Sequence, residues 1–157
     1  MSLKKNITAY SVLDFSQCQY KTWLDYIEKP KSYPKNIDPW LEIIRKIGIE
    51  HEKSYLEDLK KTNSVYEIED HLDFSEKEKE TDEAIRKGID IIYQPFLKYK
   101  NYTGSPDFLV KNKNIYEPWD VKSAFKLKPE NILQICHYSY ILNKKFNLMP
   151  EYGKIIL

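Results

Sequence analysis

Two short strand-like runs near the middle of the chain constrain its fold more than any other feature. Residues 107–110 and 115–122 are rich in apolar and aromatic side chains, and the polar segment 111–114 separates them. This pattern is typical of two strands joined by a tight turn. A two-residue loop made of Asn112 and Lys113, or a loop of all four polar residues, gives the same pairing between the strands.

That pairing brings acidic and basic side chains to one face of the hairpin. Asp107 would lie opposite Pro118, and because side chains alternate along a strand, Asp120 and Lys122 would share its face. Asp107 is then diagonal to Asp120, about 7–8 Å away at the backbone, which is close enough for both carboxylates to hold one ion. Glu117 is expected on the other face. A loop of odd length would separate the two aspartates.

Two carboxylates and an ammonium group that meet at one point are suited to the hydrolysis of a phosphodiester bond. Carboxylates bind hard cations such as Mg²⁺ or Mn²⁺, which acidify a bound water and neutralise charge on a phosphodiester. Lys122 can orient that water and offset the developing charge. A surface hairpin with ordinary charges is the alternative interpretation. The apolar neighbours Trp119 and Val121 argue against it, because free charges are uncommon among such side chains.

The composition is that of one globular domain. The chain has 157 residues, of which 41% are hydrophobic and 31% are charged. No apolar run is long enough to span a membrane and no signal-peptide core is present, so we expect no membrane association. Cys18 and Cys136 form no disulfide framework, which favours the reducing cytoplasm. The sequence stops inside an apparent strand, and we expect it to be the N-terminal part of a longer protein.

The charged residues bear on possible partners. A net charge of +1 means that the protein as a whole does not attract polyanions strongly. A polyanion such as nucleic acid would have to bind through a local basic patch or through metal ions. Arg45 and Arg86 are the only arginines among 25 basic residues. Lysine suits phosphate contact, whereas arginine makes the commonest base-specific contact, so weak sequence specificity is expected if the partner is nucleic acid. A lysine-rich proteome would explain the same bias.

The remaining patterns predict an α/β fold in which helices flank a central mixed sheet. Ser11 and Asp38 are expected to cap helices. The helix from Asp38 has an apolar stripe on one face, formed by Ile44, Ile47, His51, Tyr55 and Leu59. The predicted helices cover residues 11–26, 38–59, 75–87 and 129–145. Further predicted strands cover 65–68, 89–97 and 152–157, and a lysine- and proline-rich connection covers 29–35.

Three more side chains are candidates because of their positions. A lone histidine on an apolar helical face, such as His51, packs in a core more often than it binds metal. It becomes a candidate ligand if its helix packs beside the hairpin. Gln134 and Tyr138 share one helical face in an apolar run, where they can hydrogen-bond a phosphate or a base edge. The alternative interpretation is that the two residues form an ordinary polar side of the helix and bind nothing. His71 and His137 are interpreted as structural or exposed.

Taken in order, these segments resemble the RecB-like branch of the PD-(D/E)xK nuclease superfamily. The motifs that carry the resemblance are His51 after Gly48, Gly-Ser-Pro-Asp at 104–107, Asp-Val-Lys at 120–122 and Gln-Ile-Cys-His-Tyr at 134–138. Segments 10–24 and 81–94 also look like these proteins, so the similarity extends from about residue 8 to residue 157. Each motif is short, and their specificity lies in the order of all four.

The resemblance implies a restriction-endonuclease-like α/β fold and a metal-dependent nuclease that hydrolyses phosphodiester bonds in DNA. Such proteins act with little sequence specificity, often on single strands or ends, in DNA repair or recombination. The Mg²⁺ or Mn²⁺ ligands it implies are His51, Asp107, Asp120 and the carbonyl of Val121. Lys122 would be the catalytic lysine, and Gln134 and Tyr138 would lie near the DNA strand.

The chain departs from some relatives in its cysteines. CRISPR-associated members of the branch tie an N-terminal cysteine, placed like Cys18, to three C-terminal cysteines around an iron–sulfur cluster. This chain lacks that triplet, so we expect no cluster. Longer proteins of this kind continue into a ribonuclease H-like domain, which agrees with the abrupt end of the sequence.

Two other functions fit parts of the pattern. A non-catalytic DNA-binding or scaffolding module could retain the fold, although the intact set of acids and lysine argues against it. A metal-dependent phosphoesterase for small substrates would need a closed pocket instead of a groove. The sequence leaves open RNA as a substrate, exonuclease or endonuclease action, cleavage polarity and oligomeric state.

Overall fold

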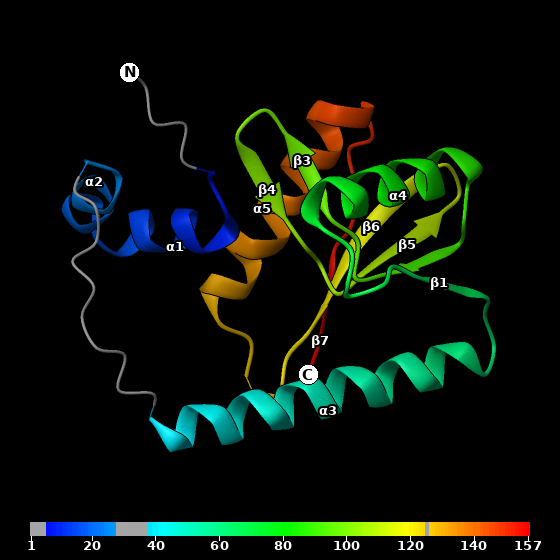
Figure 1. Ribbon diagram of the computed structural model, residues 1–157, viewed down its shortest axis with the longest axis horizontal. Coiled ribbons are helices and arrows are strands. Elements are labelled where there is room, and N and C mark those ends of the chain that lie inside the picture. The colour runs from blue at the N-terminus through cyan, green and yellow to red at the C-terminus, as the bar shows by residue number, and fades with distance from the viewer. Residues whose placement is uncertain (1–5, 28–37, 125) are drawn as a thin grey trace.

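A five-stranded mixed β-sheet forms the centre of the protein (Figure 1). The computed structural model describes residues 6–27, 38–124 and 126–157. Across the sheet the order is β1-β2-β5-β6-β7, with antiparallel pairing in the middle and a parallel pair at each edge. The strands of this sheet are Val65–Glu67 (β1), Ile91–Tyr93 (β2), Phe108–Asn112 (β5), Ile115–Val121 (β6) and Lys154–Ile156 (β7). A separate hairpin contains Leu97–Tyr99 (β3) and Tyr102–Gly104 (β4).

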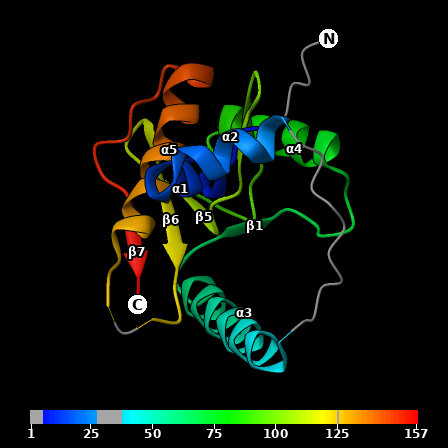
Figure 2. The ribbon, with the colours of Figure 1, turned by 90° about the vertical axis from the view of Figure 1, so that its left-hand side faces the viewer.

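Helices pack against both faces of the sheet, so the predicted mixed α/β class is confirmed (Figure 2). The helices are Ala9–Gln17 (α1), Gln19–Ile27 (α2), Pro39–Lys60 (α3), Phe74–Lys87 (α4) and Pro129–Phe146 (α5). As predicted, Asp38 caps α3 by accepting the Trp40 N–H at 3.0 Å. The predicted connection at 29–35 lies outside the described residues. Within the described ranges, no helix has both the length and the apolarity to cross a membrane.

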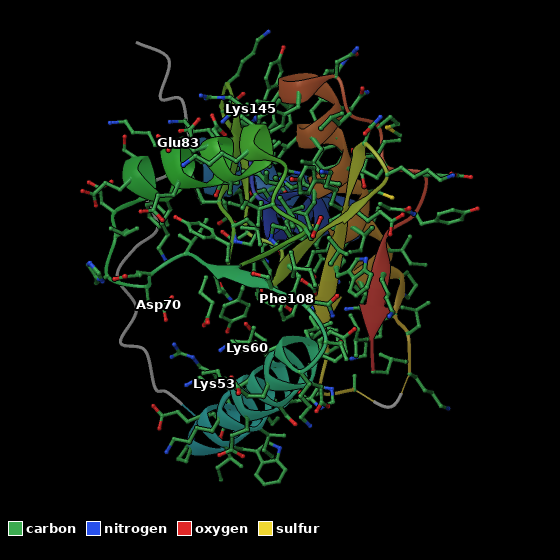
Figure 3. The ribbon with its side chains drawn as sticks, turned by 90° about the vertical axis from the view of Figure 1, so that its right-hand side faces the viewer. Lys53, Lys60, Asp70, Glu83, Phe108 and Lys145 are labelled. Atoms are coloured by element: carbon green, nitrogen blue, oxygen red, sulfur yellow. The ribbon has the colours of Figure 1, made fainter. Side chains whose placement is uncertain are left out.

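Two apolar clusters hold the helices to the sheet. On one face, Leu109 and Tyr116 of the sheet pack with buried side chains of α4 and α5. On the other face, Phe108 lies between β5 and α3 (Figure 3), with its ring centroid 5.7 Å from that of Tyr55. Phe108 and Leu109 are both fully buried, although they are neighbours on one strand. β5 is therefore covered on both sides, which rigidly positions the residues at its ends.

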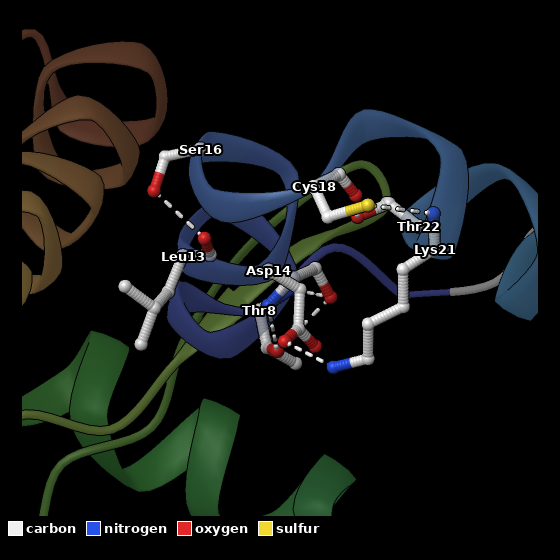
Figure 4. A network of polar contacts seen from close by, with 8 residues as sticks. Thr8, Leu13, Asp14, Ser16, Cys18, Lys21 and Thr22 are labelled. Carbon is white, nitrogen blue, oxygen red and sulfur yellow. Dashed lines mark hydrogen bonds and ion pairs between the residues drawn. The ribbon is translucent and has the colours of Figure 1, made fainter.

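The N-terminal segment forms two helices, where one was predicted. Ser11 is not the N-cap: Thr8 caps α1, and Ser11 at the third helical position accepts a hydrogen bond from the Thr8 N–H at 3.2 Å. This reciprocal capping satisfies two backbone groups, which explains the earlier start. The chain is extended at Cys18, where α1 ends and α2 follows. Lys21 of α2 reaches back to Asp14 of α1 at 2.7 Å (Figure 4).

The strand predicted at 89–97 is also divided. β2 ends at Tyr93 because Gln94 adopts a left-handed conformation with φ of 54°, and Pro95 has no N–H for a ladder. The chain then leaves the main sheet and enters β3 at Leu97. This break aims the Gln94 side chain toward α3, where it hydrogen-bonds Glu52.

Only the second half of α3 packs against the sheet as the apolar stripe predicted. Tyr55 and Leu59 contact the cluster around the buried Leu56. Ile44 and Ile47 are instead 44% and 52% exposed. The first half of the helix extends past the sheet (Figure 1), so its apolar side chains find no sheet residues to cover them.

Candidate active site

The hairpin of β5 and β6 places Asp107 beside Asp120. In this hairpin Phe108 pairs with Trp119 and Asn112 with Ile115, so the next position along puts Asp107 directly opposite Asp120. The prediction that the two acids share a face is confirmed. The loop between the strands consists of Lys113 and Asn114, whereas the prediction placed Asp107 opposite Pro118. The predicted register was therefore wrong by two residues. Lys113 has φ of 57°, and two-residue hairpin loops favour such left-handed conformations.

Asp107 lies in a partly buried position at the start of β5. Its Oδ2 accepts the backbone N–H of Val121 at 2.6 Å, which ties it to the end of β6. Burial, followed by the nearby charges of Asp120 and Glu52, raises the pKa of Asp107 to about 8. The Val121 hydrogen bond and the Lys122 charge oppose this rise but do not cancel it. Asp107 is therefore ready to bind a proton or a cation at neutral pH.

Asp120 is the more deeply buried acid, with 2% of its surface exposed. Its Oδ2 pairs with the Lys122 ammonium at 2.5 Å, and its Oδ1 accepts Gln134 Nε2–H at 3.2 Å. Burial raises the pKa of Asp120, while Lys122 lowers it and the charge of Glu52 adds to the rise. Both oxygens of Asp120 are thus oriented by neighbouring side chains.

Gln134 and Tyr138 share one face of α5, as predicted, and that face meets the acidic pair. Gln134 Nε2–H donates to Asp120 and lies 2.7 Å from the hydroxyl of Tyr138. The Tyr138 hydroxyl donates to the backbone carbonyl of Ser105 at 3.1 Å. Burial raises the pKa of Tyr138, which keeps this hydroxyl neutral and able to donate. A chain of hydrogen bonds therefore connects the segment before Asp107 to Asp120.

Glu52 and Gln94 belong to the site, although the sequence analysis gave neither of them a role in it. Glu52 lines the same cleft as the two aspartates and adds to the rise of both their pKa values. Gln94 Nε2–H donates to the Glu52 carboxylate, and the Gln94 backbone N–H donates to the Asp107 carbonyl at 2.9 Å. Gln94 thus links the acid on α3 to the acid directly before β5. The only hint in the sequence that Glu52 could belong to the site was its position directly after the candidate ligand His51.

His51 does not line the cleft that holds the two aspartates. It lines a neighbouring hollow of about 480 Å³, which also borders Lys122, Ser123 and Leu157. Its Nε2 atom is buried and has no hydrogen-bond partner among the described residues. The structure therefore brings Asp107, Asp120, Lys122 and the α5 pair together but keeps His51 to one side. Its role as a metal ligand stays a prediction.

Two other sequence interpretations can be checked around the site. His137 is buried under β4, where its Nε2–H donates to the Thr103 carbonyl at 2.9 Å, and His71 is exposed beside Glu69. Both agree with the structural or exposed roles predicted for them. Glu117 accepts Asn112 Nδ2–H at 2.8 Å and lies on the opposite face from Asp120, also as predicted.

The acidic pair opens into a cleft of about 980 Å³. Side chains from α1, α3, α4, β3, β4, β6 and α5 line it, so it is assembled from nearly the whole length of the described chain. Within this cleft the acids are Glu52, Asp107 and Asp120, and the basic residues are Arg45, Lys98 and Lys122. An anionic substrate could approach the acids only beside compensating positive charge.

The donor set is suited to a hard cation. Two buried carboxylates facing each other are costly unless a positive charge compensates them, and Lys122 pairs with only one. Among the residues that the structure describes, no three His, Cys, Asp or Glu side chains form a group that could enclose a metal. Mg²⁺ commonly binds through one or two carboxylates and keeps its other positions for water and phosphate, so the aspartate pair fits it.

Comparison with protein-family models and with curated proteins finds no match to this chain.

Proposed function

We propose that this chain is a metal-dependent nuclease that hydrolyses phosphodiester bonds in DNA and has the RecB-like PD-(D/E)xK fold that its motifs resemble. The observation that most supports it is the meeting of Asp107 and Asp120 at a cleft, with the Lys122 ammonium 2.5 Å from Asp120. The segments 104–107, 120–122 and 134–138 are separate in the sequence. The hairpin pattern already predicted that the first two segments meet, and the contacts of Gln134 and Tyr138 on α5 bring the third segment to the same point.

In this proposal, Asp107 and Asp120 hold one Mg²⁺ or Mn²⁺ together with the carbonyl of Val121. The resemblance also implies His51 as a ligand, but His51 lines the neighbouring hollow and not this cleft, so the proposal rests on the two aspartates. The cation would supply the charge that acidifies a water molecule and neutralises the phosphodiester. The protein contributes the fixed positions of its carboxylates, which the Val121 N–H and Gln134 orient.

Lys122 has the role of the catalytic lysine in this proposal. Its ammonium group borders the cleft beside Asp120, where it can orient an attacking water and offset charge on the phosphate oxygens. Gln134 donates a hydrogen bond to Asp120 and another to Tyr138, and both Gln134 and Tyr138 line the cleft where the strand would pass.

The test is a cleavage assay with labelled single-stranded and double-stranded DNA. We expect cleavage by the wild-type protein in Mn²⁺, none in EDTA, and a loss of about 100-fold or more in Lys122→Ala. Lys126→Ala is the matched control, because Lys126 is an exposed lysine four residues further along the chain that does not line the cleft. We expect this control to cleave as the wild type does.

Each other outcome has a defined meaning. Full activity in Lys122→Ala would contradict the role given to that residue. DNA binding without cleavage in any divalent cation would favour the non-catalytic scaffolding module instead. Cleavage of small phosphodiesters but not of DNA would favour the small-substrate phosphoesterase.

A further inference from the structure

Two large aromatic side chains line the same cleft as the acidic pair. Tyr10 belongs to the first turn of α1 and is 74% exposed. Phe74 is the first residue of α4 and is 73% exposed. Single exposed aromatic residues are ordinary on a protein surface. These two are unusual because different elements bring them to the same concave site as Asp107 and Asp120.

Each aromatic residue is supported while most of its surface stays open. The Phe74 ring packs against Phe96 with 5.1 Å between the ring centroids, and Phe96 itself is 8% exposed. Tyr10 follows Ala9, which packs against the main apolar cluster, and it lies close enough to Tyr138 to add to the rise of its pKa. A ring that is supported by the protein and open to the cleft is suited to stacking on a planar ligand.

Positive charges accompany these rings in the cleft. Arg45 on α3 forms no ion pair with any described carboxylate, and it lines the cleft together with Lys98. Lys98 keeps 45% of its side chain exposed although it lies 3.5 Å from Glu78. Planar stacking surfaces combined with spaced cations suit a polynucleotide, whose bases stack on rings while its phosphates meet ammonium and guanidinium groups.

We propose that Tyr10 and Phe74 are base-stacking residues that make the cleft select unpaired nucleotides. This inference rests on the proposed nuclease function and specifies how its substrate is recognised. In a duplex each base face is covered by the next base pair, so the rings would have nothing to stack on. In an unpaired strand the bases can turn toward the rings while the backbone passes Asp107 and Asp120.

The test measures binding by fluorescence anisotropy in EDTA, where the proposed cleavage cannot consume the probe. The probes are a labelled single-stranded DNA oligonucleotide, an abasic oligonucleotide of the same length, and the duplex. We expect Tyr10→Ala and Phe74→Ala each to weaken binding of the single strand about tenfold and to leave abasic binding unchanged. Tyr10→Trp should keep the affinity, because a larger ring still stacks.

The matched control is Tyr152→Ala. Tyr152 is 62% exposed, as an aromatic residue away from the cleft, and its replacement should change no affinity. Thermal melting of each variant checks that it is folded, and at 74% exposure Tyr10 contributes little to the core.

The outcomes separate this inference from the proposed function. If the wild type binds and cleaves DNA but both alanine variants bind the single strand as tightly as it does, the stacking role is wrong and the nuclease proposal stands. An equal loss of abasic and normal oligonucleotide binding would also overturn it, because stacking needs a base. If the wild type neither binds nor cleaves DNA, both proposals fail.

Discussion

Asp107 and Asp120 sit where their negative charges are costly to the folded protein. Burial removes water from both carboxylates, and their opposed positions on β5 and β6 add mutual repulsion. The Val121 N–H and the Lys122 ammonium compensate only part of this. Cation binding at the pair should therefore compete with protons and release them.

This arrangement predicts that the cation-free protein becomes less stable as the pH rises. The pKa of Asp107 is about 8 in the folded state against an ordinary 3.8, so between these values the folded protein binds more protons. Its free energy of unfolding should fall as pH rises toward 8, by no more than about 1.4 kcal/mol per pH unit. Asp107→Asn should remove this contribution, as measured by urea denaturation in EDTA at pH 6 and pH 8.

The comparison between wild type and variant isolates Asp107 together with its effect on the neighbouring Asp120. His137, whose pKa is lowered by burial, titrates in both proteins and cancels. Parallel pH profiles in the two proteins would contradict the assigned cause. Mn²⁺ added at pH 8 should stabilise the wild type more than Asp107→Asn, and equal stabilisation would mean that Asp107 is not a ligand.

At the scale of elements, the site depends on how closely the β3–β4 hairpin approaches α5. His137 and Tyr138 of α5 hydrogen-bond the carbonyls of Thr103 and Ser105, on either side of Gly104. A Cβ atom at Gly104 would lie 2.6 Å from Cε1 of Tyr138, which is closer than real contacts allow. Glycine at this position therefore lets the strand carry the segment before Asp107 against the helix.

Gly104→Ala should displace the Tyr138 ring and destabilise the protein by about 1–3 kcal/mol. Gly48→Ala is the matched control. A Cβ atom at Gly48 would meet only the Ser123 hydroxyl at 3.7 Å, and alanine favours a helix interior such as α3. The control should be neutral or stabilising by about 0.5–1 kcal/mol. Urea denaturation measures both, and equal effects would mean that the approach to Tyr138 is not close.

At the scale of the whole molecule, one lysine joins the two helices on the same face of the sheet. Lys145 of α5, which Figure 3 labels, contacts Glu78 at 2.8 Å and Asp82 at 2.7 Å, and both acids belong to α4. The Lys145 side chain is only 16% exposed. These ion pairs are therefore less screened by water than those on the surface, and they fix α4 relative to the helix that carries Gln134 and Tyr138.

Lys145→Met should leave Glu78 and Asp82 with only their longer contacts, to Lys98 at 3.5 Å and to Arg86 at 3.9 Å. We expect the free energy of unfolding to fall by about 1–3 kcal/mol. Lys21→Met tests the effect of an exposed pair, because Lys21 contacts Asp14 at a similar 2.7 Å with 59% of its side chain exposed. Little change is expected there. Denaturation with urea compares the two variants, and an equally small effect of Lys145→Met would contradict a role in joining the helices.

Local patterns predicted a considerable part of this fold. Strand alternation was enough to put Asp107, Asp120 and Lys122 on one face, because any even-length loop preserves that parity. Capping chemistry located the start of α3 at Asp38, and the proline at its first position agrees with it. Helical spacing was likewise enough to put Gln134 and Tyr138 on one face of α5. These properties depend on residues that are near one another in the chain.

Other features were decided only when distant segments met. The register of β5 and β6, the break at Gln94 and the inclusion of Glu52 in the cleft depend on contacts between segments separated by many residues. The position of His51 in the neighbouring hollow likewise depends on how α3 packs against distant segments of the chain. The sequence by itself determined which side chains share a face, because backbone periodicity is local. The tertiary structure decided which faces meet, because that depends on packing across the whole core.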